Sequence, residues 1–270
     1  MTQDHYAVMG NPIKHSQSPT IHGLFAQQTG QQMTYEKLLV AEDAFVNTVA
    51  AFWQQGGKGL NITVPFKQAA WALAEVKDDL AETAGAVNTL MQRDGQIYGY
   101  NTDGVGLVRD LTENCQISLA DTSILILGAG GAARGVMLPL LKMRPKRIWI
   151  ANRTAEKAAQ LVDQFSAYGP VVGSGLDAIE GTFELVINAT AAGLTQRIPH
   201  IDPALIHARS ACYDMMYGQE PTAFVAWAKT QGARVVFDGL GMLVEQAAQA
   251  FNLWRQVVPN TAPVIAQLRG

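Results

Sequence analysis

The fold of this chain is decided by the stretch Ser123-Ile124-Leu125-Ile126-Leu127-Gly128-Ala129-Gly130-Gly131-Ala132-Ala133-Arg134-Gly135. An apolar run of strand length stops at Gly128, and a helical pattern follows until Pro145. Gly128, Gly130 and Ala133 have the spacing G-x-G-x-x-A, which permits a tight turn, close approach of a pyrophosphate and close helix packing. Phosphates would bind at the helix N-terminus, where free N–H groups and the dipole favour anions. The stretch predicts a dinucleotide-binding unit, and a glycine-rich turn without a ligand is the alternative.

The residues after the second expected strand indicate which cofactor this unit takes. The strand runs from Lys146 to its polar end at Asn152-Arg153-Thr154, about 20 residues beyond the glycine loop, where NAD enzymes carry an acidic residue for the ribose hydroxyl. Here the acidic residue is missing, and Arg153 and Lys157 supply the positive charge that a 2′-phosphate requires. We therefore expect NADP. In the alternative reading, Thr154 caps the next helix and Arg153 is a solvated charge.

Length and composition place limits on the possible classes of protein. A chain of 270 residues exceeds the usual size of one domain, so we expect two. The net charge of −3 argues against nucleic acid or an anionic membrane as a partner. Cys115 and Cys212 are too few for a disulfide framework, and the N-terminal residues lack the pattern of a signal peptide. We expect a cytoplasmic protein without a membrane-spanning segment.

The first hundred residues alternate between strand and helix patterns. We expect strands at 6–9, 33–40 and 59–64, helices at 19–28, 42–55, 80–84 and from Pro65, and a hairpin turn at 93–96. Ser18 and Pro19 have the residue types of a helix N-cap and a first helical position, so Ser18 needs no functional role. Ser16 lacks such an explanation. Lys67 falls in a first helical turn, where a cation opposes the dipole. Asp103 can be read as the N-cap of a helix over 105–111.

The second half of the chain continues the alternation, which is typical of a parallel sheet covered on both faces. Strands are expected at 185–188, 211–215 and 234–237, and helices at 155–165, 221–231 and 262–268. A further long helix is opened by residues 238–242 and runs to about 258. The predicted fold is α/β with two domains, and ligand chemistry is expected in the cleft between them. Residues 1–103, completed by 239–270, form an α/β substrate-binding domain. Residues 104–238 form an NADP-binding Rossmann domain with a doubly wound parallel sheet, and the C-terminal helices return to the first domain.

Several segments together resemble one enzyme family, the shikimate dehydrogenases, from about Tyr6 to Leu268. They are Ser16–Pro19, Asn61–Lys67, Gly85–Thr89, Asn101–Gly104, Gly128–Ala132, Asn152–Thr154, Tyr213–Tyr217 and Gly239–Leu243. Members of this family reduce 3-dehydroshikimate to shikimate with NADPH in aromatic amino-acid biosynthesis. The resemblance therefore implies an NADP-dependent oxidoreductase of the shikimate pathway.

The resemblance also implies roles for individual residues. Lys67 and Asp103 would be the catalytic pair. The substrate carboxylate would bind Ser16, Ser18 and Tyr217, and the substrate hydroxyls would bind Thr63, Asn88, Asp103 and Gln246. The cofactor would contact Gly128, Ala129, Gly130, Gly131, Ala132, Asn152, Arg153, Thr154 and Lys157, with Met215 and Gly239 near the nicotinamide. The chain departs from the family at Lys157, where Arg is frequent, and at Ala191-Ala192, which replaces a more polar pair.

The chemistry agrees with these implied roles. Reduction of a ketone leaves an alkoxide that must gain a proton, so an ammonium group within hydrogen-bond reach suits the reaction. A neighbouring carboxylate would orient that ammonium group. The reaction needs no metal ion, and the five histidines form no ligand pattern. We expect no metal, and a monomer or homodimer whose partners are the substrate and NADP.

Two other functions fit the same fold. A broader quinate/shikimate dehydrogenase that uses NAD is the nearer one, and the Asn152-Arg153-Thr154 segment argues against it. A ligand-sensing regulator without catalysis belongs to a different class. Such a regulator would be expected to have lost Lys67 or Asp103, and it would carry a DNA-binding segment or a basic patch.

Overall fold

The computed structural model describes residues 3–190, 198 and 200–270. The chain divides into two compact units, one formed by residues 1–106 with 244–270 and the other by residues 107–243. Both unit boundaries fall inside helices, in α5 (Asp103–Arg109) and in α9 (Leu240–Arg255). Among the described residues, no helix combines the length and the apolar character that crossing a bilayer requires.

The first unit contains a mixed six-stranded sheet with the order β2-β1-β3-β5-β6-β4. Its strands are β1 (Asp4–Gly10), β2 (Met33–Leu39), β3 (Gly57–Ile62), β4 (Val76–Lys77), β5 (Thr89–Arg93) and β6 (Gln96–Tyr100). Strands β1, β2 and β3 are parallel, whereas β5 runs antiparallel to both β3 and β6. The predicted hairpin joins β5 to β6, and Asp94 and Gly95 at its turn have φ of 51° and 80°.

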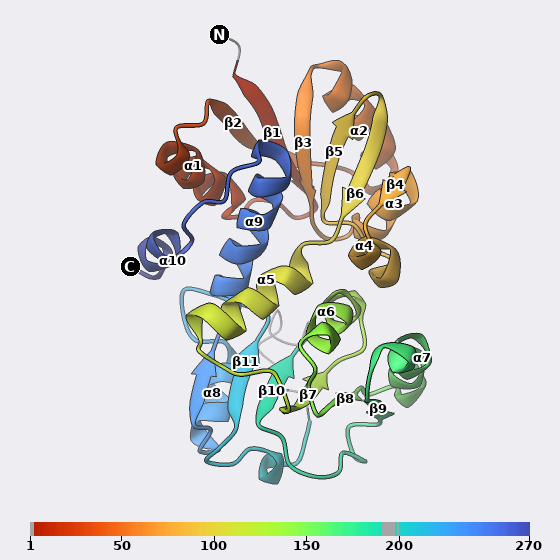
Figure 1. Cartoon of the computed structure of the whole chain (residues 1–270), viewed down its shortest axis with the longest axis vertical. Helices are drawn as coiled ribbons and strands as arrows, with labels where there is room; N and C mark the ends of the chain where they lie inside the picture. The colour runs from red at the N-terminus through yellow and green to blue at the C-terminus, as the bar shows by residue number, and fades with distance from the viewer. Residues whose placement is uncertain (1–2, 191–197, 199) are drawn as a thin grey trace. The chain divides into compact units, whose positions relative to one another are not determined.

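Helices cover both faces of this sheet (Figure 1). One face is apolar and packs on α2 (Phe45–Gln54) and α3 (Lys67–Leu73), with Leu60, Ile62 and Leu90 in its core. The other face meets α1 (Ser18–Thr29) and the C-terminal part of α9, where Trp254 packs on Tyr6 and donates a hydrogen bond to the Leu90 carbonyl. The unit also contains α4 (Asp79–Ala84) and α10 (Ala262–Arg269), so the C-terminal helices return to the first part of the chain as expected.

The second unit contains a six-stranded sheet in which every strand is parallel to its neighbours, with the order β12-β11-β10-β7-β8-β9. Its strands are β7 (Ser123–Leu127), β8 (Arg147–Ala151), β9 (Val171–Ser174), β10 (Leu185–Asn188), β11 (Ala211–Asp214) and β12 (Val235–Phe237). Its helices include α6 (Gly131–Lys142), α7 (Ala155–Phe165) and α8 (Ala223–Thr230). The strand order reverses between β7 and β10, and such a switch point is where doubly wound sheets bind ligands. The predicted Rossmann sheet is confirmed.

Three local predictions need correction. The N-cap position of α1 is Gln17, and the helix makes no side-chain capping hydrogen bond, so the expected capping role of Ser18 is wrong. The helix expected to start at Pro65 begins at Lys67. Two strands, β4 and β9, have no counterpart in the sequence analysis, because strands of two and four residues are too short for a clear alternation.

Candidate active site

An ion pair between Lys67 and Asp103 is the centre of the site in the first unit. Each residue is the first of its helix, and Lys67 Nζ lies 2.5 Å from Asp103 Oδ2. The side chains are 32% and 15% exposed, so solvent reaches the ammonium more easily than the carboxylate. No acidic residue stands in the first turn of α3, so the carboxylate that balances this cation comes from another element. The pair provides a proton donor held in one position by a carboxylate.

Asn88 fixes the other side of the Asp103 carboxylate. Its Nδ2 donates to Asp103 Oδ1 at 2.9 Å, while its Oδ1 accepts from the backbone N–H of Thr102 at 2.9 Å. That backbone donor decides which way the Asn88 amide points, because in a flipped amide the NH₂ group of Asn88 would face the N–H of Thr102. Asn88 Nδ2 also lies 3.4 Å from Gln246 Oε1. The structure thus brings together four of the predicted residues: Lys67, Asp103, Asn88 and Gln246.

These contacts also decide between the two interpretations of Asp103. Helix α5 begins at Asp103, and the carbonyl of Thr102 accepts its first helical hydrogen bond, from Gly106 N. Both carboxylate oxygens of Asp103 face side chains from other elements. The carboxylate therefore orients Lys67 and Asn88, and it is not accounted for by a plain capping role.

The two predicted serines lie together at the start of α1. Ser16 Oγ donates to Ser18 Oγ at 3.2 Å, and the backbone N–H of Ser18 donates to Ser16 Oγ at 3.3 Å. Ser16 is half-buried and Ser18 is buried. A pair of adjacent hydroxyl groups at a helix start can donate to a carboxylate. Since Ser18 does not cap α1, its hydroxyl has no helical function that competes with a ligand.

Among the described residues, no side-chain hydrogen bond joins Thr63 to this cluster. Thr63 follows β3, and a Cβ added at Gly10 would lie 2.4 Å from the Thr63 methyl group, so only glycine fits there. Tyr217 belongs to the second unit, is half-buried, and has its pKa raised by that burial. The roles that the sequence predicts for these two residues stay predictions.

The glycine loop in the second unit has the shape that its sequence predicts. Gly128 has a φ of +106°, in the left-handed region that favours glycine, directly after β7. A Cβ added at Gly130 or Gly131 would have no protein atom within 4 Å, whereas Ala133 is fully buried against the sheet. The two glycines therefore serve no packing need within the described protein, and they leave the N-terminus of α6 open to a ligand.

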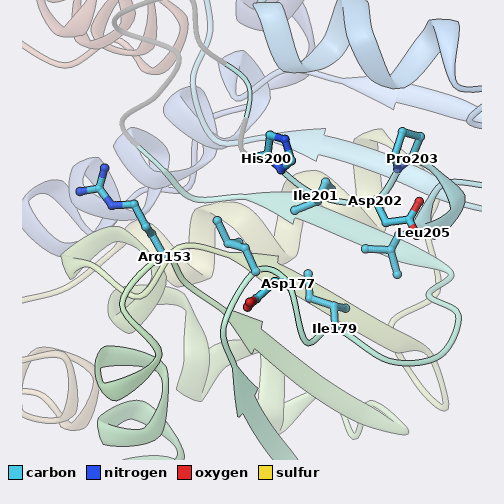
Figure 2. A pocket seen from close by; sticks show the side chains of 9 residues that line it. Arg153, Asp177, Ile179, His200, Ile201, Asp202, Pro203 and Leu205 are labelled. Atoms are coloured by element: carbon cyan, nitrogen blue, oxygen red, sulfur yellow. The ribbon is translucent and has the colours of Figure 1, made fainter.

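The residues that follow β8 are those predicted to bind the adenosine part of the cofactor. Thr154 is the N-cap residue of α7 but makes no side-chain capping bond, and Asn152 Nδ2 donates to its carbonyl at 2.9 Å. Arg153 and Lys157 are exposed. Arg153 also lines one side of a pocket of about 610 Å³, with Asp177 and Pro203 among the other lining residues (Figure 2). This pocket contains neither Lys67 nor Asp103.

Met215 and Gly239 meet at the carboxyl ends of β11 and β12. A Cβ at Gly239 would lie 2.3 Å from the Met215 carbonyl oxygen, so glycine is required for this contact. The buried Asp214 organises the same edge, because its carboxylate accepts from Asn188 Nδ2 at 3.1 Å and from Thr222 Oγ1 at 2.6 Å. Burial raises the pKa of Asp214.

Sequence reasoning assigned no role to Asp214, Asn188 or Thr102. Thr102 and Asp214 lie within quoted motifs, and Asp214 and Asn188 end neighbouring strands, which was an available signal. The predicted departure at Ala191-Ala192 lies outside the described residues. Within the described ranges, no group of three or more His, Cys, Asp or Glu side chains could hold a metal ion.

Comparisons with known proteins cover nearly the whole chain. Three family profiles match: the shikimate dehydrogenase substrate binding domain at residues 8–90, shikimate / quinate 5-dehydrogenase at 110–197, and the shikimate 5'-dehydrogenase C-terminal domain at 239–269. The shikimate dehydrogenase (NADP(+)) of Alkalilimnicola ehrlichii is 52% identical, over 98% of each chain. Among solved structures, an Ael1 enzyme from Pseudomonas putida has a TM-score of 0.94 at 44% identity, covering 98% of each chain. A Thermus thermophilus shikimate 5-dehydrogenase, in complex with NADP(H) and shikimate, has a TM-score of 0.88 at 31% identity, covering 99% of each chain.

Proposed function

The chain belongs to the shikimate dehydrogenase family, and on this premise we propose that it catalyses the reversible NADPH-dependent reduction of 3-dehydroshikimate to shikimate. The observation that carries the proposal is the Lys67–Asp103 pair, with an N–O distance of 2.5 Å and Asn88 on the second carboxylate oxygen. An oxidoreductase of this kind needs one positioned proton donor and no metal ion. Its partners are the substrate and the cofactor, and the protein is a monomer or homodimer.

Lys67 acts as the general acid in the proposed reaction. Bound NADPH supplies the hydride. As the ketone carbon is reduced, its oxygen becomes an alkoxide, and Lys67 Nζ donates a proton to that oxygen. Asp103 holds the ammonium in position through its Oδ2. Because the Lys67 side chain is 32% exposed, it can take a proton from solvent before the next turnover.

The remaining polar groups of the first unit orient the substrate. Ser16 and Ser18 donate to its carboxylate, and Tyr217 is proposed as the third donor. Asn88, Gln246, Asp103 and Thr63 contact its hydroxyl groups. Hydroxyl and amide groups that are already held in position lose little freedom when a ligand binds, which favours affinity. Thr102 supports this arrangement, since its backbone N–H and its hydroxyl both donate to Asn88 Oδ1.

The second unit fits NADP through the open start of α6 and the charges that follow β8. A side chain added at Gly130 or Gly131 would meet no protein atom within 4 Å, so a pyrophosphate has room to approach the N-terminus of α6 there. Arg153 and Lys157 are exposed cations suited to the 2′-phosphate, with Arg offering a fork of donors and Lys a point charge. Met215 and Gly239, at the carboxyl edge of the sheet, are proposed to line the nicotinamide site.

The direct test follows NADPH absorbance with 3-dehydroshikimate as substrate, with NADH as the cofactor control. We expect turnover with NADPH and much weaker turnover with NADH. Comparable turnover of quinate with NAD would instead support a broader quinate/shikimate dehydrogenase. Binding of shikimate without turnover of either substrate would support a ligand-sensing protein of the same fold.

A further inference from the structure

A group of polar side chains lies in the first unit on the sheet face that meets α1, and all but one of them are buried. It consists of His22, Tyr35, Asn61 and Thr89, which we name the polar layer. His22 and Thr89 are fully buried and Asn61 is 6% exposed. The His22 ring stacks on the Tyr35 ring with 4.3 Å between centroids and 8° between planes. None of these four residues has a role in the reaction as described so far.

One end of the polar layer is the Tyr35 hydroxyl, which donates to Asn61 Oδ1 at 2.7 Å. Burial raises the pKa of Tyr35, so this hydroxyl keeps its proton and stays a donor.

The other end reaches the catalytic pair. Asn61 Nδ2 donates to Thr89 Oγ1 at 3.1 Å, and Thr89 Oγ1 donates to Asn88 Oδ1 at 3.0 Å. Asn88 Nδ2 donates to Asp103 Oδ1, as described above. Asn61 and Thr89 are directly opposite each other on β3 and β5, so the sheet register itself sets this link.

Two donors, His22 Nε2 at 3.1 Å and the Tyr35 hydroxyl, face the Asn61 amide oxygen. Burial lowers the pKa of His22 to about 3, so the ring is neutral near pH 7. Because an amide oxygen only accepts, the ring proton lies on Nε2. The Asn61 amide cannot flip without facing these donors with its NH₂ group. Asn61 therefore has one orientation, with its NH₂ group toward Thr89.

The fold does not require polar groups at these positions. On the opposite face of the same strands, Leu60, Ile62 and Leu90 form an apolar core. A buried polar group needs partners to avoid a desolvation penalty, so an apolar layer would be the simpler way to stabilise this face. The hydrogen bonds of the polar layer lead to Asn88, a residue of the candidate site, while His22 Nδ1 is buried without a hydrogen-bond partner among the described residues.

We propose that the polar layer is a positioning network for the reaction. It holds Asn88 in place for Asp103 and Lys67. This inference rests on the proposed function and deepens it, because it assigns positioning residues that do not touch the substrate. Tyr35 and His22 orient Asn61, and Thr89 acts on catalysis through Asn88.

The Thr89 link is tested with Thr89→Val and Thr89→Ser. Valine keeps the shape and removes the hydroxyl, whereas serine keeps the hydroxyl and removes a buried methyl group. We expect Thr89→Val to lower kcat about three- to tenfold, the value of one net hydrogen bond, with the KM for NADPH unchanged. Thr89→Ser should stay within about twofold of wild type in kcat, although it loses stability through the small cavity.

The Tyr35 link is tested with Tyr35→Phe, and Tyr98→Phe is the matched control. Tyr98 lies on β6 and is not part of the polar layer. Tyr35→Phe removes one of the two donors to Asn61 Oδ1 and should lower kcat about two- to threefold, with the KM for NADPH unchanged. Tyr98→Phe should match wild type.

The outcomes separate the inference from the function on which it rests. Wild-type protein without turnover of 3-dehydroshikimate would overturn the proposed function, and the inference with it. With an active wild type, equal kcat values for Thr89→Val and Thr89→Ser would overturn only the inference. Equal kcat values for Tyr35→Phe and Tyr98→Phe would do the same. Melting temperatures of all variants show whether activity merely follows stability.

Discussion

The two candidate binding regions of this molecule are built in opposite ways. In the first unit, Lys67, Asp103 and Asn88 are held by side-chain hydrogen bonds to one another. In the second unit, a side chain added at Gly130 or Gly131 would meet no protein atom within 4 Å, and Arg153 is exposed. The reacting groups are therefore fixed in the protein by itself, while the cofactor region offers backbone N–H groups and exposed cations. Fixed donors suit a chemical step, because they need little reorganisation at the moment of reaction.

The largest expected effect tests the hydrogen-bonded group of Lys67, Asp103 and Asn88 in the first unit. Lys67→Met removes the proton donor and keeps an unbranched side chain. It should lower kcat by about 10²–10⁴, the range of a positioned acid–base group, while the Kd for NADPH stays close to wild type. Steady-state kinetics and fluorescence titration with NADPH measure the two quantities. Lys58→Met, at an exposed position on β3, is the control and should be fully active. Near-normal kcat in Lys67→Met would contradict the role of Lys67.

The next effect tests the candidate cofactor region of the second unit. Arg153→Ala should weaken NADPH binding roughly ten- to a hundredfold, because a charge-assisted hydrogen bond contributes about 1.5–3 kcal/mol. NADH binding should hardly change, since NADH has no 2′-phosphate. Calorimetric titration with both cofactors measures the difference, and Lys142→Ala, exposed at the end of α6, is the control. An equal loss for both cofactors would mean that Arg153 has a structural role.

A third effect concerns the dependence of stability on pH. Burial lowers the pKa of His22 from 6.5 to about 3, so below pH 6.5 the unfolded chain binds a proton that the folded protein does not. The contribution of the neutral His22 ring to the free energy of unfolding is therefore fully present above pH 6.5 and is lost as the pH falls toward 3. At pH 5 this loss is about 2 kcal/mol in the free energy of unfolding.

Urea unfolding at pH 7.5 and pH 5 measures this contribution. His22→Gln keeps a donor toward Asn61 and removes the titration, so its free energy of unfolding should fall by about 2 kcal/mol less than that of wild type over this range. His15→Gln, at an exposed position, should keep the wild-type dependence. The same dependence in all three proteins would rule out a buried, neutral His22.

The smallest effect compares a binding hydroxyl with a true helix cap. Asp78 caps α4, since its Oδ1 accepts from Ala81 N at 2.8 Å, and Asp78→Ala should lower the free energy of unfolding by about 1 kcal/mol without loss of activity. Ser18→Ala should raise the KM for 3-dehydroshikimate with no greater loss of stability. Thermal unfolding and kinetics on both variants provide the comparison. A larger stability loss in Ser18→Ala than in Asp78→Ala would favour a structural role for Ser18.

Much of the fold could be predicted because its signals are local. The glycine spacing after β7, the apolar strands and the hairpin at Asp94 and Gly95 all depend on residues close together in the chain. The capping prediction at Ser18 was wrong for an equally local reason. Gln17, the N-cap residue, has a helical φ and ψ of −89° and −3°, and residue types alone do not reveal this.

The sequence by itself determined the cofactor chemistry and the doubly wound sheet. It also singled out Lys67, because a cation in the first turn of a helix is unfavourable to the helix dipole. Only the tertiary structure decided which side chains meet. Lys67 and Asp103 are 36 residues apart, and Tyr35 and Asn61 are 26 apart. Asn61 and Thr89 meet because β3 and β5 pair in one register. Side-chain hydrogen bonds act over about 3 Å, so they depend on strand order and register, which arise from packing of the whole unit and are not encoded in any short stretch.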